Sequence, residues 1–234
     1  MAILIFDLDD TLFDLAKPLF EAMSIVYSNR IPPLSNEHFT AFRKYSDERF
    51  EESQSGAISM EEMYIYRIRK TLWDMGVSTT DSEALLFQDE YLRCQQNIHL
   101  SPVVREMLCY CRENNIITAI ISNGSAEHQM KKVNTLGLTD FIPKEHIFLS
   151  GSVGYAKPDP RIFTYAAEKL CHHREKTYYI GDSFLNDIIG PKKIFFGTVW
   201  YNRRNYLIES DVTPDYTVTT DSELYEIVKL IANE

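Results

Sequence analysis

The pattern of hydrophobic and polar residues along this chain changes from strand-like to helix-like and back again. Residues 2–6 (AILIF) form a short uninterrupted apolar run, which is typical of a strand buried on both faces of a sheet. Similar runs follow later in the chain, at residues 116–122, 146–150, 177–182 and 197–201. Helical spacing separates these later runs, and such alternation predicts an α/β fold: a Rossmann-like parallel sheet with helices on both faces.

Residues 15–98 differ from the rest because their apolar positions recur mainly at helical spacing. Two Ser/Thr-x-x-Glu capping boxes, at 59–62 and 80–83, indicate helix starts within this stretch. We expect three or four helices here, and these would form an inserted all-α unit. Residues 1–14 and 99–234 then make up the α/β domain, whose first strand is separated from the second by the insertion.

Composition and charge narrow the class of protein. A chain of 234 residues that is 44% hydrophobic can bury a substantial core, as one domain with a large insertion or as two modest domains. Its 24 basic and 34 acidic residues give a formal charge of −10, so we expect no nucleic-acid polymer as a partner. No apolar run approaches the length of a membrane span, and the N-terminus lacks the features of a secretory signal. We therefore expect a cytoplasmic protein without a membrane partner; no pattern indicates its oligomeric state.

The cysteines do not point to a metal or redox site. There are four of them, and they are Cys94, Cys109, Cys111 and Cys171. Their spacing does not match a zinc site, and a reducing compartment keeps such thiols reduced. We expect free thiols.

Polar residues stand directly after the predicted strands. The first strand runs into Asp7, Asp9 and Asp10, although an isolated carboxylate is costly to desolvate. Ser122 ends the second strand and Asp182 ends the fourth. Taken singly, each has a structural explanation as a turn residue, a helix cap or a helix N-terminal acid. Because ligands of parallel α/β sheets bind outside the carboxyl ends of the strands, we expect these residues to converge on one site.

Taken in order, these residues resemble the four motifs of the haloacid dehalogenase-like (HAD) hydrolases. The matching set is Asp7-x-Asp9-x-Thr11, Ser122, Lys157 and Gly181-Asp182-x4-Asp187. The resemblance covers essentially the whole chain, and residues 15–98 match the position and size of the α-helical cap of that superfamily. It implies a HAD-like fold and a phosphatase, because the dehalogenases of the superfamily typically lack the second aspartate. The stretches GAIS, GYAKPDPRIF and TVWYN are similar to the pyrimidine 5′-nucleotidase subgroup.

The resemblance also implies roles for individual residues. Asp7 would be the nucleophile that forms an aspartyl-phosphate, and Asp9 would be the general acid/base. A Mg²⁺ ion would relieve the repulsion between a carboxylate and a phosphate dianion. Its expected ligands are the carboxylates of Asp7 and Asp182 and the backbone carbonyl of Asp9. Asp10 is expected to be a bystander.

The remaining motif residues would bind the substrate phosphate or orient the metal ligands. Lys157 would neutralise the nucleophile and the phosphate as a point charge, while Ser122 and Asn123, with backbone N–H groups near Gly124, would bind phosphate oxygens. Asp187 and Thr11 would lie behind these groups, and Asp187 would orient a metal water and Lys157.

These roles predict a Mg²⁺-dependent phosphatase acting on a small-molecule phosphate ester, with a nucleoside 5′-monophosphate as the expected substrate. Two other substrates stay open, namely a sugar phosphate and flavin mononucleotide. A phosphonatase would need a Schiff-base lysine in the cap; no motif identifies one, although Lys44 and Lys70 keep this alternative open. From a different class, a non-catalytic sensor of a phosphate ligand also stays open.

One stretch departs from the family pattern. The family usually continues after its last motif as Gly-Ala-x-x-Ala-Gly, whereas this chain reads GPKKIFF at 190–196. Pro191 should shorten or bend a helix there, and Phe195 stands where the family often has glycine. We expect altered local helix geometry without an effect on the catalytic residues.

Overall fold

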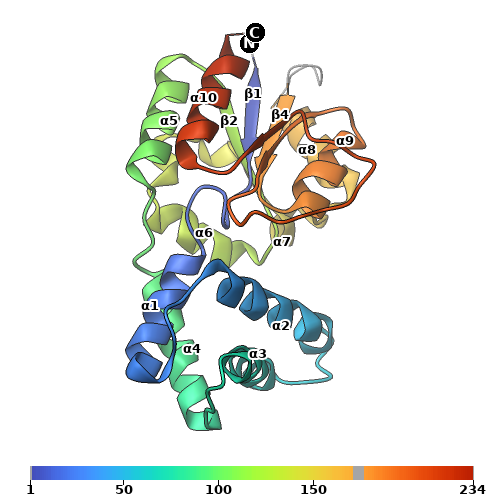
Figure 1. Cartoon of the computed structure of the whole chain (residues 1–234). Helices are drawn as coiled ribbons and strands as arrows, with labels where there is room; N and C mark the ends of the chain where they lie inside the picture. Colours follow the sequence, from blue (N-terminus) through green and yellow to red (C-terminus); the bar gives the residue numbers. More distant parts are fainter. Residues whose placement is uncertain (1, 171–176, 234) are drawn as a thin grey trace. The chain divides into compact units, whose positions relative to one another are not determined.

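The computed structural model describes residues 2–170 and 177–233 (Figure 1). Its contacts divide the chain into two compact units. One unit consists of Met1–Asp14 and His99–Glu234, and the other of Leu15–Ile98. The first is an α/β domain and the second is entirely helical.

The α/β unit is built on a six-stranded parallel sheet with the strand order β3-β2-β1-β4-β5-β6. The strands are β1 (Ile3–Phe6), β2 (Ile117–Ser122), β3 (Ile147–Leu149), β4 (Thr177–Gly181), β5 (Gly197–Tyr201) and β6 (Tyr216–Val218). This order winds outward from β1 in both directions, as in a Rossmann-like doubly wound sheet. The predicted fold class is confirmed.

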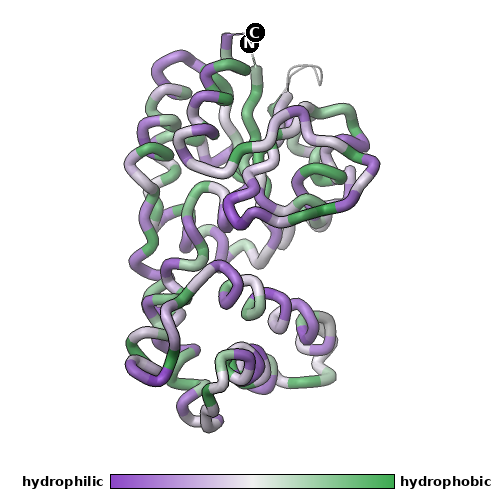
Figure 2. The backbone as a smooth tube through the Cα atoms, in the orientation of Figure 1, coloured by the Kyte–Doolittle hydropathy of each residue, from purple (hydrophilic) through white to green (hydrophobic). Residues whose placement is uncertain are grey.

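Strand β1 occupies the centre of the sheet and carries the first acids at its end. All four of its residues are buried, and Figure 2 shows it as a hydrophobic segment. Phe6 is in register with Ile120 of β2 and with Ile180 of β4. The residues that follow these three positions therefore lie at one edge of the sheet, at the point where the strand order reverses.

Helices cover both faces of this sheet (Figure 1). Helices α5 (Pro102–Glu113) and α10 (Asp221–Ala232) pack on each other over one face, and α5 contacts β2. On the other face, Ile162 and Phe163 of α8 (Pro160–Lys169) join Ile3 and Ile5 in a buried cluster. Shorter helices complete this unit: α6 (Ala126–Thr135), η2 (Leu138–Asp140), η3 (Lys144–His146), α7 (Ser150–Val153), the π-helix η5 (Phe184–Ile189) and α9 (Gly190–Lys192).

The second unit consists of α1 (Ala16–Tyr27), η1 (Ser28–Arg30), α2 (Asn36–Gln54), α3 (Met60–Asp74) and α4 (Asp81–Gln95). Both predicted capping boxes are present, with Ser59 starting α3 and Thr80 starting α4. Helix α1 packs against α4, and α2 against α3. The rings of Phe42 and Phe87 lie 5.9 Å apart in its core. The all-α character of the insertion is confirmed.

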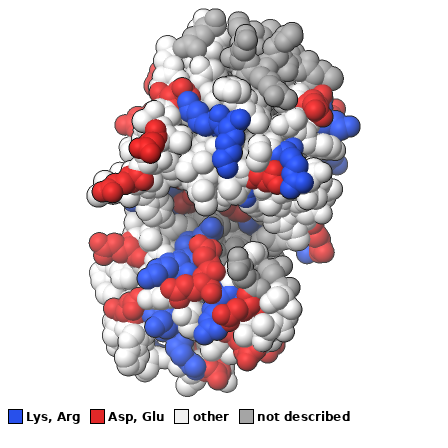
Figure 3. All heavy atoms as spheres, turned by 90° about the vertical axis from the view of Figure 1, so that its right-hand side faces the viewer, with Lys and Arg blue, Asp and Glu red and all other residues white. Residues whose placement is uncertain are grey.

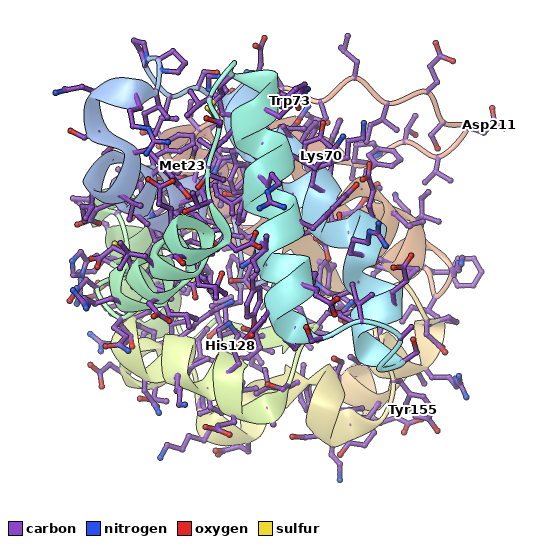
Figure 4. The ribbon with its side chains drawn as sticks, turned by 90° about the horizontal axis from the view of Figure 1, so that it is seen from below. Met23, Lys70, Trp73, His128, Tyr155 and Asp211 are labelled. Atoms are coloured by element: carbon purple, nitrogen blue, oxygen red, sulfur yellow. The ribbon has the colours of Figure 1, made fainter. Side chains whose placement is uncertain are left out.

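Two lysines of this helical unit lie beside one aromatic ring. The ammonium groups of Lys44 and Lys70 lie 5.7 and 5.5 Å from the centroid of the Tyr45 ring. Figure 4 labels Lys70 on α3, together with the largely exposed Trp73. Both lysines therefore make cation–π contacts.

The last strand and helix were not among the predicted elements. Strand β6 has only three residues, which is too short for a periodic pattern. Helix α10 does begin with a capping box, formed by Thr220 and Glu223. The departure at 190–196 has its expected effect: α9 is a three-residue piece after a π-helix, and Phe195 takes a left-handed conformation with φ 65°.

The described cysteines Cys94, Cys109 and Cys111 are free thiols, as predicted, and Cys171 lies outside the described residues. Among the described helices, none combines the length and the apolar character needed to cross a bilayer. On the face shown in Figure 3, basic and acidic side chains are interspersed rather than separated into patches of one sign.

Candidate active site

Three carboxylates meet at the carboxyl ends of β1 and β4. Asp7 is the first residue after β1, and its N–H donates to the carbonyl of Ile180 at 2.8 Å, which extends the strand pairing by one residue. Asp182 follows β4 directly, and Asp187 lies in the π-helix η5. Asp7, Asp182 and Asp187 each offer an oxygen, and these oxygens all lie within 4.8 Å of one another.

The backbone around Asp187 fixes its position in this cluster. Asp187 is fully buried, and its Oδ2 accepts from the N–H of Ser183 at 2.9 Å. Its own N–H donates to the carbonyl of Ser183 at 2.7 Å. A Cβ on Gly181 would lie less than 3.0 Å from the Asp187 carboxylate, so glycine is required there. The π-helix is a local geometry that often occurs at functional sites.

Lys157 links the acids of the cluster. Its Nζ donates to Asp7 Oδ1 at 2.6 Å, to Asp187 Oδ1 at 2.7 Å and to the hydroxyl of Tyr179 at 2.9 Å. The Tyr179 hydroxyl in turn donates to the carbonyl of Ile121 at 2.8 Å. Lys157 is 5% exposed, and these contacts use all three of its donors. The ammonium group is therefore held in a single place.

Asn123 holds the backbone of the same lysine. Its Oδ1 accepts from the N–H of Lys157 at 2.8 Å, and its Nδ2 donates to the carbonyl of Lys157 at 2.9 Å. The N–H of Gly124, expected to face phosphate, instead donates to Ser150 Oγ at 2.9 Å. The side chain of Asn123 therefore positions Lys157, and phosphate binding by Asn123 stays a prediction for its backbone N–H.

Burial and charge determine the protonation of this cluster. Burial raises the pKa of Asp7 to about 7; Lys157 opposes that rise, whereas Asp187 and Asp9 add to it. Burial also disfavours the charge of Lys157, but Asp187 and Asp7 outweigh it and hold the pKa of Lys157 well above its ordinary value. Lys157 is therefore a permanent cation, while Asp7 is partly protonated near neutral pH, and further positive charge would favour its carboxylate form.

The donor set fits a divalent metal ion. Magnesium binds through carboxylate oxygens and needs only one or two of them from the protein. Asp7, Asp182 and Asp187 carry three carboxylates, and Lys157 is the cation that contacts two of them. The cluster can therefore hold a metal ion, and the supporting role expected for Asp187 stays a prediction.

The carboxylate of Asp9 takes part in a separate set of contacts. Lys132 of α6 donates to both its oxygens, at 2.6 and 2.8 Å, and Gln129 Nε2 donates to Oδ2 at 2.8 Å. The same Gln129 nitrogen lies 2.7 Å from the hydroxyl of Ser122, which is 1% exposed. The predicted acid/base and the predicted phosphate-binding serine are thus joined by one amide.

Asp10 has a structural contact, and its expected lack of a role in the reaction stays a prediction. It is buried, takes a left-handed conformation with φ 63°, and forms an ion pair with Arg204. Arg204 also pairs with Asp14 at 2.5 Å, and its side chain is only 4% exposed. Thr11 is fully buried, and its hydroxyl has no hydrogen-bond partner among the described residues. A supporting role for Thr11 stays a prediction.

Four residues of this region were not identified from the sequence. They are Tyr179, Gln129, Lys132 and Arg204. Gln129 and Lys132 are three residues apart, so they share a face of the helix that follows Ser122, and this spacing was a usable signal. Tyr179 and Arg204 depend on partners that are distant in the sequence.

Comparison with known proteins gives the family. The family model of the haloacid dehalogenase-like hydrolases matches residues 1–194. A glyceraldehyde 3-phosphate phosphatase of Pyrococcus furiosus is 26% identical, with 97% of this chain and 92% of the relative covered. The pyrimidine 5′-nucleotidase YjjG of Escherichia coli is 23% identical, over 95% and 96% of the two chains.

A solved structure agrees with these relatives. The crystal structure of the HAD-hydrolase YfnB of Bacillus subtilis bound to magnesium is similar to this chain with a TM-score of 0.70 and 26% sequence identity. The similarity covers 97% of this chain and 98% of YfnB. Because the family model spans most of its length and the fold agrees, this chain belongs to the haloacid dehalogenase-like hydrolases.

Proposed function

We propose that this protein is a Mg²⁺-dependent phosphatase that hydrolyses a small phosphate monoester through a phosphorylated Asp7. The observation that carries this proposal is the contact of Lys157 with Asp7 and Asp187, beside Asp182. A nucleophile, a fixed cation and oxygen ligands for a divalent ion then lie together, and they would supply the attacking group and the charge neutralisation that hydrolysis of a phosphate monoester needs. Asp9, two residues after the nucleophile, supplies the acid/base.

The protein groups act in two steps. A carboxylate oxygen of Asp7 attacks phosphorus, and the bond from phosphorus to the ester oxygen breaks. Asp9 delivers a proton to that leaving oxygen and later removes one from the water that attacks the aspartyl-phosphate. Lys157 offsets the negative charge on the nucleophile and the phosphate throughout. Hydrolysis releases inorganic phosphate and restores Asp7.

The same geometry supports a metal site and a phosphate site. We assign Asp7, Asp182 and the backbone carbonyl of Asp9 to Mg²⁺, which would supply positive charge beside the phosphate oxygens. Asp187 orients Lys157, because both of its carboxylate oxygens already accept hydrogen bonds from the protein. The hydroxyl of Ser122 and the backbone N–H of Asn123 complete the phosphate site.

The substrate proposal rests on the relatives and on the sequence stretches named above. The 5′-nucleotidase relative supports a nucleoside 5′-monophosphate. The glyceraldehyde 3-phosphate phosphatase relative supports a second candidate, a phosphorylated sugar or triose. We further propose that residues 1–14 and 99–234 are the catalytic core and that residues 15–98 serve as the cap.

A panel of phosphate monoesters tests the proposal. Nucleotides, sugar phosphates and flavin mononucleotide are assayed for released phosphate with Mg²⁺ and with chelator, using wild type and Asp7→Asn. We expect turnover of at least one ester with Mg²⁺ and a loss of at least a thousandfold in chelator or in Asp7→Asn. Binding without hydrolysis of any ester would replace the phosphatase by a phosphate-ligand sensor, and preference for a sugar phosphate would overturn only the nucleotide assignment.

A further inference from the structure

Helix α6 presents two side chains to the predicted acid/base. We propose that Lys132 and Gln129 are positioning residues, which hold the Asp9 carboxylate in the orientation that proton transfer to and from the substrate requires. This inference rests on the proposed function, because it concerns a step of that reaction. None of the four family motifs identified in the sequence contains either residue.

The contact with Lys132 differs from an ordinary surface ion pair. Lys132 donates to both oxygens of Asp9, and its side chain is 9% exposed. Lysine is almost never buried unless it is paired, so burial of this ammonium group depends on the carboxylate. The next residue, Lys131, is 72% exposed and pairs with Glu127 of its own helix. Two adjacent lysines of one helix therefore have opposite environments.

Gln129 joins the acid/base to the end of β2. Its Nε2 lies 2.8 Å from Asp9 Oδ2, 2.7 Å from Ser122 Oγ and 2.9 Å from the carbonyl of Asn123. Because three oxygens surround this nitrogen, the reverse orientation of the amide would place its own oxygen against them. The amide orientation is thus determined by its surroundings, and Asp9 is tied to the loop that carries the predicted phosphate site.

The loop is shaped to admit this amide. Gly124 has φ 139°, and a Cβ there would lie 3.1 Å from Cγ of Gln129. Gln129 itself is 2% exposed. The backbone of Gly124 therefore lies close to the Gln129 side chain, whose amide is placed between Ser122 and Asp9. The left-handed backbone and the burial of a polar amide both cost free energy, which favours a function for this arrangement.

These contacts restrict the motion of the carboxylate. A general acid must place one oxygen about 3 Å from the atom that receives its proton, and a displacement of about 1 Å can lower a rate by about a hundredfold. Lys132 holds both oxygens and Gln129 holds one, so rotation of the carboxylate breaks two or more hydrogen bonds. Removing the hydrogen bonds of Lys132 should slow proton transfer by Asp9 but leave the nucleophile Asp7 in place.

The test compares Lys132→Met with Lys131→Met, which removes the same charge from the adjacent position. With the best alkyl phosphate from the panel and Mg²⁺, Lys132→Met should lower kcat about 10- to 100-fold, and Lys131→Met should change it less than about twofold. Lys132→Arg should recover much of the loss, because guanidinium also binds a carboxylate through two donors. Lys132→Gln serves if the methionine variant does not fold.

Two further readouts separate positioning from a merely structural effect. Single-turnover release of p-nitrophenol from p-nitrophenyl phosphate should fall much less than alkyl-phosphate turnover, because p-nitrophenolate leaves without a proton. In an Asp9→Asn background, Lys132→Met should cause little further loss, since it acts through the group already removed. An equal loss in both backgrounds would overturn the inference, as would a wild-type kcat in Lys132→Met.

The possible failures remain distinguishable. If wild type turns over esters but Lys132→Met behaves like Lys131→Met, this inference fails and the proposed function stands. If wild type hydrolyses no ester in the panel, the proposed function fails and the inference falls with it. In that case a coupled loss of stability between Asp9→Asn and Lys132→Met would show that the ion pair is only structural.

Discussion

Gly181 and Asp187 approach each other so closely that no side chain fits on the glycine. A Cβ on Gly181 would lie less than 3.0 Å from Cβ, Cγ and Oδ2 of Asp187. The end of β4 and the π-helix that follows it are thereby locked together, with Asp182 between them. The fit of these two residues determines where the buried carboxylate of Asp187 meets Lys157.

Gly181→Ala should therefore damage the metal cluster. The added methyl group must displace the Asp187 carboxylate from Lys157 and from the N–H of Ser183. We expect apparent Mg²⁺ affinity to fall about 10- to 100-fold and the free energy of unfolding to fall by about 1–3 kcal/mol. Titration calorimetry with Mg²⁺ and urea unfolding measure the two effects.

Gly197→Ala is the matched control for that change. A Cβ on Gly197 would overlap the ring of Tyr178 to a similar degree, away from the acids. It should affect stability but leave Mg²⁺ affinity at the wild-type value. Equal affinity in both variants would show that the Gly181–Asp187 fit does not position the metal ligands.

The raised pKa of Asp7 predicts how stability depends on pH when divalent ions are chelated. Burial raises this pKa from 3.8 to about 7, so the folded protein binds a proton that the unfolded chain has already released. The stabilisation is fully present below pH 3.8 and is lost as pH rises to about 7. This contribution has a limiting slope of about 1.4 kcal/mol per pH unit.

Urea unfolding of wild type and Asp7→Asn in chelator, at a series of pH values between 4 and 8, measures this contribution as a difference. Subtracting the free energy of unfolding of Asp7→Asn from that of wild type isolates the contribution of Asp7, because the other groups titrate in both proteins and cancel. Mg²⁺ should restore stability to wild type at neutral pH but do so only weakly for Asp7→Asn. Parallel pH curves for the two proteins would contradict the assignment.

Tyr179→Phe should show what the tyrosine hydroxyl does for Lys157. The substitution keeps the ring, which lies 5.3 Å from Lys157 Nζ, but removes the acceptor for Lys157 and the donor to the Ile121 carbonyl. We expect a loss of about 1–3 kcal/mol in the free energy of unfolding. Because Lys157 keeps its two carboxylates, kcat should fall less than about tenfold.

Thermal or urea unfolding together with kcat on the best ester checks this expectation, with Tyr165→Phe on the exposed side of α8 as control. The control should alter neither quantity. A loss of activity in Tyr179→Phe as large as in Asp7→Asn would instead place the hydroxyl in the reaction itself.

Substitutions of the proposed catalytic acids should affect turnover, whereas loss of the ion pair of Asp10 should affect stability. Asp7→Asn and Asp9→Asn should nearly abolish turnover while the protein stays folded. Arg204→Met should lower the free energy of unfolding by about 3–5 kcal/mol, because it removes the cation that pairs with the buried Asp10, whereas the partly exposed Asp14 keeps its pair with Arg203. The folded fraction of this variant should keep most of its kcat.

The partly exposed pair of Lys192 and Asp215 provides the comparison for that variant. These residues lie 2.7 Å apart on the surface, so Lys192→Met should cost less than about 1 kcal/mol. Unfolding free energies and active-site-normalised turnover are measured for both variants. A stable Arg204→Met protein that had lost its turnover would assign Arg204 to catalysis instead.

The parts of the site that could be predicted are those in which local pattern and topology suffice. Asp7 and Asp182 each follow a buried apolar strand, and the rule for parallel sheets brings such strand ends together. Their convergence follows from patterns that span about ten residues each. The alternation of strands and helices likewise determines the fold class.

Other parts depend on register and packing that no local pattern contains. Tyr179 meets Lys157 only because β4 pairs with β1 in one register. The spacing of Lys132 places it on one helix face with Gln129, but only the packing shows that this face, and not the exposed Lys131, meets Asp9. Arg204 reaches Asp10 from a loop after β5, at a separation of 194 residues. Such contacts are decided by the tertiary fold.

The central place of β1 has a consequence for how the protein is made. This strand is synthesised well before its neighbours, because β2 and β4 begin at Ile117 and Thr177. At a synthesis rate of about 5–20 residues per second, its apolar segment waits roughly 5–20 s for a first partner strand. The helical unit Leu15–Ile98 is compact, and all of its residues are synthesised within that interval. The helical unit can therefore form before the sheet, and Asp7 and Asp182 can come together only after β4 has emerged.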